Sequence, residues 1–237
     1  MLMSEALTNS QSQLDELNVT SFYWTIPELR VWVNDACRDI ARRTETIEAY
    51  TTSLTAVAGQ AKYNLPADVI RVHRCEFIPT NSTQVYPIQA STYDELDQIW
   101  GINPSFQSSY PSAYACWGTP GSMTILFYPV PAQTGTFNFY YYAMPVNLAT
   151  AGTTIGAGAD DGKTLTIPFG WDDLIVEYVT YRAMTKAKDP NWQTHKQLYD
   201  QNIQYLIDVT RQAHDNGRFI QTMTSNVPQW LYQFTDE

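Results

Sequence analysis

The sequence has little cysteine and little positive charge. Its 237 residues include three cysteines, Cys37, Cys75 and Cys116, an odd and sparse set that does not form a disulfide framework. We therefore expect reduced thiols. The 14 Lys and Arg are outnumbered by 24 Asp and Glu, so the formal net charge is −10. Proteins that wrap DNA by neutralising its phosphates need the opposite sign, so this chain either does not grip nucleic acid or only surrounds it.

The sequence also lacks long apolar segments. It has no run of about 18 apolar residues, so we expect no membrane span. Its first residues, MLMSEALTNSQSQLDEL, show no basic stretch followed by an apolar one. This pattern predicts that the chain carries no signal peptide.

The region between Cys75 and Gly162 contains no Lys or Arg at all. Its few acids are Glu76, Asp94, Glu95, Asp97, Asp160 and Asp161. A solvated β domain normally mixes charges over its surface. A long, aromatic and nearly uncharged region therefore indicates coverage by other protein. The alternative is a neutral surface coated by Ser, Thr, Asn and Gln.

Helical periodicity begins with TIPELRVWVNDACRDIARRTE, which predicts a helix over about 26–44. The positions expected to be buried are Leu29, Trp32, Val33, Ala36, Cys37 and Ile40. Thr25 and Glu28 have the spacing of a capping box, with Pro27 in the first turn.

The helical period returns after Pro168. The spacing predicts one helix over about 171–188 and another over about 190–215, with Asp189 as the N-cap of the second and Gly217 closing it. The tail that follows is aromatic without a clear period, so we expect an arm that becomes ordered on a partner or packs back on its own helices.

The middle of the chain predicts strands. Segments such as SAYACWG, SMTILFYPV and TFNFYYYAMPV are short, β-branched and aromatic, and are separated by Pro, Gly, Asn and Ser. One short helix, YDELDQIW, is expected after a cap at Ser91 or Thr92 and before Gly101.

These elements predict an α+β fold with three parts. Residues 1–51 and 167–216 form a helical bundle domain. Residues 52–166 form an inserted β-rich domain, sandwich-like or barrel-like. Residues 217–237 form an extended C-terminal arm.

The stretch GADDGKTLTIPFGWDDL, residues 158–174, superficially combines two active sites. Residues 162–164, Gly-Lys-Thr, match the end of a phosphate-binding loop, but the glycine that the motif requires falls on Ala157. Asp160 and Asp161 would repel phosphate, and the LTIP that follows predicts a strand rather than a helix. We predict a flexible loop with a turn at Asp161 and no nucleotide site.

Other candidate catalytic or metal-binding residues are equally weak. Asp172 and Asp173 could hold a divalent metal, but acids in a first helical turn also complement the helix dipole. His73 and Cys75 alternate on a strand and should face the same way, with Cys116 as a possible neighbour, yet the paired spacing typical of zinc is missing. We predict no catalytic residue, no metal and no cofactor.

Tyr140 and Tyr142 should share one face of a strand. The choice is between a core or subunit contact, which we favour, and a platform for stacking sugars. Base stacking is disfavoured because the region lacks Lys and Arg.

Taken in order, the segments PELRVWVNDACRDIARRTE, YNLPADVIRVHRCEF, PIQASTYDELDQIWG, TILFYPVPAQTGTFNFYYYAMPVNL and LTIPFGWDDLIVEYVTYRAM resemble the phage adaptor proteins, the head-to-tail connectors of tailed bacteriophages. The resemblance runs from about Thr25 to about Asp215. It implies a ring, typically of twelve subunits, that sits beneath the portal, extends the DNA channel and docks the tail. It implies no catalytic residues.

From this resemblance we expect a structural virion protein of the neck between capsid and tail, assembled in the host cytoplasm. The implied partners are the portal protein, a tail, nozzle or next neck protein, and further copies of the chain. The protein would surround genomic DNA without specific binding and would not contact a membrane. The residues expected at partner interfaces are Phe219, Trp230, Tyr232 and Phe234 of the arm, and Tyr140 and Tyr142. The rival functions are a tail-associated carbohydrate- or receptor-binding protein, suggested by the aromatic β domain, and an enzyme acting through residues 162–164 or Asp172 and Asp173.

Overall fold

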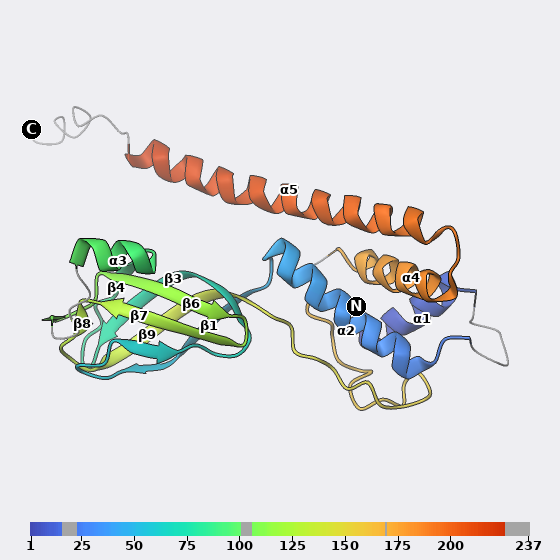
Figure 1. Ribbon diagram of the computed structural model, residues 1–237, viewed down its shortest axis with the longest axis horizontal. Coiled ribbons are helices and arrows are strands. Elements are labelled where there is room, and N and C mark those ends of the chain that lie inside the picture. The colour runs from blue at the N-terminus through green and yellow to red at the C-terminus, as the bar shows by residue number, and fades with distance from the viewer. Residues whose placement is uncertain (16–22, 101–105, 169, 226–237) are drawn as a thin grey trace, which may run out of the picture.

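A computed structural model describes residues 1–15, 23–100, 106–168 and 170–225. Within these residues the protein is mixed α+β, with most helices gathered at one end and the strands, together with one short helix, at the other (Figure 1). The helices are α1 (Met3–Gln13), α2 (Ile26–Thr44), α3 (Tyr93–Trp100), α4 (Asp173–Ala187) and α5 (Trp192–Ser225). The strands are β1 (Glu48–Ala56), β2 (Lys62–Asn64), β3 (Val69–Pro79), β4 (Tyr86–Ala90), β5 (Gln107–Ser108), β6 (Ala113–Thr119), β7 (Ser122–Tyr128), β8 (Val130–Pro131) and β9 (Gly135–Ala143).

Helix α2 confirms the prediction from periodicity. All six apolar positions expected on its inner face are buried. Thr25 is the N-cap, but its side chain makes no capping hydrogen bond, so the predicted capping box is wrong. The Glu28 carboxylate instead accepts a hydrogen bond from Lys186 of α4. This residue therefore joins two helices rather than closing the start of one.

Helix α1 has no counterpart among the predicted elements. It begins without a Ser, Thr, Asp or Asn cap, and polar Ser10 and Gln11 lie on its buried side, which interrupts the apolar pattern. The Glu5 carboxylate accepts a hydrogen bond from the Leu2 N–H at 2.7 Å and so satisfies one free donor of the first turn.

Helix α4 lies close to its predicted range, whereas α5 begins near the predicted start but ends at Ser225 rather than at about residue 215. Asp172 is the N-cap of α4, and Asp189 accepts a hydrogen bond from the Asn191 N–H at 2.8 Å just before α5. Gly217 does not close α5, which continues to Ser225. A single interior glycine costs a helix only about 1 kcal/mol relative to alanine, which does not suffice to end one.

One hydrophobic core joins α1, α2, α4 and α5. Its fully buried members include Met3, Leu7, Leu29, Ile40, Ile175, Val179 and Ile203. Burying each such side chain contributes about 1.5–3 kcal/mol. Helix α5 extends past α2 toward the end of the molecule that holds the sheet (Figure 1).

The main sheet has seven strands in the order β1-β9-β3-β4-β6-β7-β2, antiparallel except between β4 and β6. It is curled. Phe127 of β7 and Phe137 of β9 stack with ring centroids 3.9 Å apart, although three strands separate β7 from β9. In a flat sheet these strands would lie about 19 Å apart. The sheet therefore bends around an aromatic core as a half-barrel, in agreement with the predicted barrel-like β region.

Gly135 lies where β9 and β3 approach each other closely. A Cβ at Gly135 would lie 2.4 Å from the Ile78 carbonyl oxygen and 2.6 Å from the Phe77 ring, so only glycine fits.

The predicted short helix α3 is present and is capped by Thr92. The Thr92 hydroxyl accepts from the Glu95 N–H at 3.2 Å, while the Glu95 carboxylate accepts from the Thr92 N–H at 3.0 Å.

Candidate functional site

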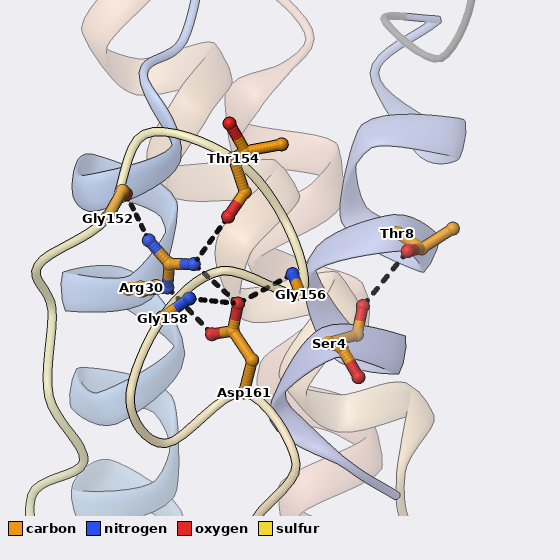
Figure 2. Close-up of polar contacts among 8 residues, drawn as sticks. All are labelled: Ser4, Thr8, Arg30, Gly152, Thr154, Gly156, Gly158 and Asp161. Atoms are coloured by element: carbon orange, nitrogen blue, oxygen red, sulfur yellow. Dashed lines mark hydrogen bonds and ion pairs between the residues drawn. The ribbon is translucent and has the colours of Figure 1, made fainter.

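The loop that leads from β9 to α4 is folded around one arginine of α2 (Figure 2). Arg30 is completely buried, and its guanidinium forms a bidentate ion pair with Asp161, with Nε–Oδ1 at 2.9 Å and Nη2–Oδ2 at 2.6 Å. It also donates hydrogen bonds to the carbonyl oxygens of Gly152 and Thr154. A buried charge needs such partners, so Arg30 fixes the path of the whole loop.

Backbone N–H groups of its own loop bind the Asp161 carboxylate. Its carboxylate accepts hydrogen bonds from the N–H groups of Gly156 at 2.7 Å and Gly158 at 3.1 Å. The Arg30 hydrogen bond, together with those glycine N–H groups, holds the pKa of Asp161 below its usual value despite burial. A Cβ at Gly158 would lie 2.7 Å from Asp161 Oδ1, so the close approach requires glycine.

Lys163 points outward and contributes nothing to an anion site. Its ammonium lies 2.8 Å from Asp160 Oδ1, and Asp160 also accepts from the Ala149 N–H at 2.6 Å. The LTIP segment was predicted to form a strand, but it is not a strand of the sheet, so that prediction is wrong. Thr164 forms an isolated bridge with Leu2, because α1 begins against this loop and competes for its backbone groups. The loop is thus held to α2 through Arg30 and to the start of α1 through backbone hydrogen bonds from Met3 and Ser4.

The remaining metal candidates are dispersed. Within residues 1–15, 23–100, 106–168 and 170–225, no three His, Cys, Asp or Glu side chains gather as metal ligands. The prediction that His73 and Cys75 face the same way is wrong. A bulge between Val72 and Arg74 shifts the register of β3 against β9. The His73 side chain is therefore exposed, whereas the Cys75 side chain is fully buried. Burial raises the pKa of the thiols, to about 12 for Cys116.

The outer face of β1, β9 and β3 carries what we term the aromatic–basic ladder. It comprises Tyr50, Arg71, His73, Arg74, Tyr140 and Tyr142. The Tyr50 and Tyr140 ring centroids lie 4.7 Å apart, and those of His73 and Tyr142 lie 5.2 Å apart. The prediction that Tyr140 and Tyr142 share a face is confirmed.

Arginine side chains lie over two of the tyrosine rings of this ladder. The guanidinium carbon of Arg74 lies 5.2 Å from the Tyr140 ring centroid, and that of Arg71 lies 5.4 Å from the Tyr142 centroid. Sugar stacking needs an open aromatic face, and the arginines restrict access to Tyr140 and Tyr142, while Tyr50 is 52% exposed. A mixed aromatic and arginine surface is instead typical of the energetically important part of a protein–protein interface.

The sequence alone did not identify Arg30 as a functional residue, and it predicted Asp161 only as part of a turn. A signal for Arg30 was available, because it follows Ile26 by four residues and precedes Val33 by three, and so lies on the buried stripe of α2. No comparable signal marked Asp161 as its partner. The arm residues Trp230, Tyr232 and Phe234 lie outside the described residues, and Phe219 belongs to α5.

Comparison with known protein families shows which family the chain resembles. A family model described as SU10 adaptor protein matches residues 2–225, which include both the helices and the sheet. No curated protein matches the chain. Among the described residues, no helix is long and apolar enough to cross a membrane.

Proposed function

The chain belongs to the SU10 adaptor protein family, and on this premise we propose that it is the head-to-tail adaptor of a tailed bacteriophage. The family is one of structural phage adaptors and is not known for enzymatic activity. In this proposal the protein forms a ring beneath the portal, and the expected number of subunits is twelve. The ring extends the DNA channel and docks the tail or the next neck protein. It thus belongs to the virion neck.

The observation that carries this proposal is the extent of the family match, from residue 2 to residue 225, over every described helix and strand. Charge supports it. An acidic protein, with a formal net charge of −10, can surround moving DNA without adhering to its phosphates.

We assign the two parts of the fold different contacts. The helical bundle of residues 1–51 and 167–216 would dock against the portal and neighbouring copies, while the β-rich residues 52–166 would contact the tail or the next subunit. The aromatic–basic ladder is the strongest candidate surface in the second part, since Tyr140 and Tyr142 lie there with Arg71 and Arg74. The loop around Arg30 links both parts, because it leaves β9 and packs against α2.

The C-terminal arm is proposed to reach the portal or an adjacent subunit. Removing residues 226–237 leaves α5 whole as far as Ser225 and deletes Trp230, Tyr232 and Phe234. We expect the truncated protein to keep its circular dichroism spectrum and melting temperature but to lose attachment to portal-filled heads in a sedimentation assay. Attachment equal to that of the full chain would remove the arm from the proposal, while leaving ring formation to be tested separately.

The carbohydrate-binding alternative has a direct test. A glycan array probed with the purified protein would favour it if the protein bound a sugar class and lost that binding on Tyr140→Ala. We expect no such binding, because Arg74 and His73 lie against the rings that a sugar would need.

A further inference from the structure

A basic pocket of about 440 Å³ lies where the end of α2, the sheet and α5 meet. We term it the arginine pocket, because its walls include Arg42, Arg43, Arg71 and Arg211. Only 14 Lys and Arg occur in the whole chain. This acidic protein therefore places an unusual share of its positive charge at one point, where three elements converge.

Carboxylates within the chain neutralise only part of this charge. Arg43 Nη1 lies 2.8 Å from Asp200 and 3.6 Å from Asp39, and Arg71 pairs with Glu45. In the described part of the chain, no carboxylate lies within 4.0 Å of Arg42 or Arg211. The Arg42 Nε donates to the Arg38 carbonyl oxygen, at 3.3 Å.

The helix dipole accounts for one of these two cations. Arg42 lies in the last turn of α2, where positive charge is favourable. Arg211 lies well inside α5, far from either end of that helix, so the dipole gives no reason for its position. The pocket thus holds positive charge that no contact within the described chain explains.

Complementary charge lies on α3. Asp94 and Asp97 are exposed, and no Lys or Arg of the described chain lies within 4.0 Å of them. The sequence around them contains no Lys or Arg from residue 76 to residue 161. Glu95 differs, because its carboxylate caps the helix by accepting from Thr92 and Ser91. The cation near α3 is Lys62, which lines a pocket with Tyr93 and lies over the Trp117 ring, 5.7 Å from its centroid.

We propose that the arginine pocket of one copy receives the acidic face of α3, Asp94 and Asp97, from a second copy. The pocket is lined by the end of α2 with β3 and α5, whereas Asp94 and Asp97 belong to α3. Helix α3 and the end of α2 lie at opposite ends of the sheet (Figure 1), so we expect the two patches to meet only between copies. Their opposite charge favours encounter and fixes the orientation of the two copies. Because the patches differ, the contact is head-to-tail and closes into a ring when the rotation permits. The inference rests on the proposed ring function and names the contact that builds it.

Charge reversal tests the contact. We expect Arg42→Glu/Arg211→Glu and, separately, Asp94→Lys/Asp97→Lys to reduce self-assembly in the presence of portal by roughly tenfold or more, since both create like-charge contacts. Combining all four substitutions in one chain restores opposite charges and should recover assembly. Lys196→Glu is the matched control, because Lys196 is exposed on α5 away from the pocket and should assemble normally.

Native mass spectrometry of each variant with portal gives the readout, and circular dichroism melting checks that each variant folds. Assembly of Arg42→Glu/Arg211→Glu at the wild-type level would overturn the inference, as would failure of the four-substitution chain to recover. If Arg42→Glu/Arg211→Glu lost binding to duplex DNA but kept its subunit contacts, the inference would also be overturned, because the pocket would then be a phosphate site. If the wild-type protein forms no ring with portal, the proposed function fails instead.

Discussion

Replacing Asp161 by asparagine should destabilise the protein more than almost any other single polar substitution. The change keeps the shape of the side chain, and its amide oxygen can still accept from the N–H groups of Gly156 and Gly158. It removes the charge that faces Arg30, which is fully buried. Breaking one side of a buried ion pair costs about 3–5 kcal/mol, because the other charge stays buried without compensation. The whole free energy of unfolding of a typical domain is roughly 5–15 kcal/mol.

Urea unfolding followed by tryptophan fluorescence measures this loss, and its pH dependence has a definite sign. Arg30 lowers the pKa of Asp161 in the folded protein. The stabilisation is therefore complete above the ordinary carboxyl value, about 3.9, and is lost as the pH falls through the lowered value. We expect a constant difference between wild type and Asp161→Asn from pH 5 to pH 8. The difference should shrink only below about pH 4.

A double variant makes the reasoning refutable. Adding Arg30→Met to Asp161→Asn removes the unpaired buried charge, so the double variant should be more stable than Asp161→Asn alone. Asp160→Asn serves as the control within the same loop, since its partner Lys163 is exposed and the loss should be much smaller. A loss below about 1 kcal/mol for Asp161→Asn, or a double variant less stable than the single, would show that Arg30 does not organise the loop as described.

Three further outcomes follow from the structure. Lys163→Ala should leave folding and assembly unchanged, which native mass spectrometry would check. A malachite green phosphate assay should show no loss of nucleotide hydrolysis relative to the wild type. Iodoacetamide at pH 8 should label Cys37 and Cys116 only after unfolding, since burial raises the pKa of both thiols to about 12, and rapid labelling of the folded protein would contradict this. Phe137→Ala should cost about 3–5 kcal/mol in urea unfolding because it empties the centre of the aromatic core, and a loss below 1 kcal/mol would place Phe137 outside that core.

The sequence predicted best where a single periodic signal decided the structure. The stripe from Leu29 to Ile40 of α2 and the alternation of Tyr140 and Tyr142 both depend only on local spacing, and both are confirmed. The barrel-like character of the β region also followed from short aromatic strands separated by turn residues, because such strands bury one face by curling together.

The failures have physical causes beyond local spacing. A bulge in β3 reverses the expected relation between His73 and Cys75, and a bulge leaves no clear mark in a sequence. Helix α1 is held by tertiary contacts with α2 and α4 rather than by a strong pattern of its own. The pairing of Arg30 with Asp161 spans 131 positions, so no local rule could join them.

The candidate surfaces show the same division. Composition indicated that the β region is unusual, since it lacks Lys and Arg after Cys75. It could not show that arginines from α2, β3 and α5 gather beside that region, because their meeting depends on how the helices and the sheet are placed together. The interface role of the ladder and of the arm therefore remains a prediction.

The most direct measurement is the mass of the complex that the purified protein forms with its portal. Native mass spectrometry or electron cryomicroscopy of the mixture should show a closed ring of identical adaptor copies on the portal, with the expected number of twelve. Persistence of the protein as a monomer that does not bind portal, under conditions in which heads accept tails, would contradict the proposed function.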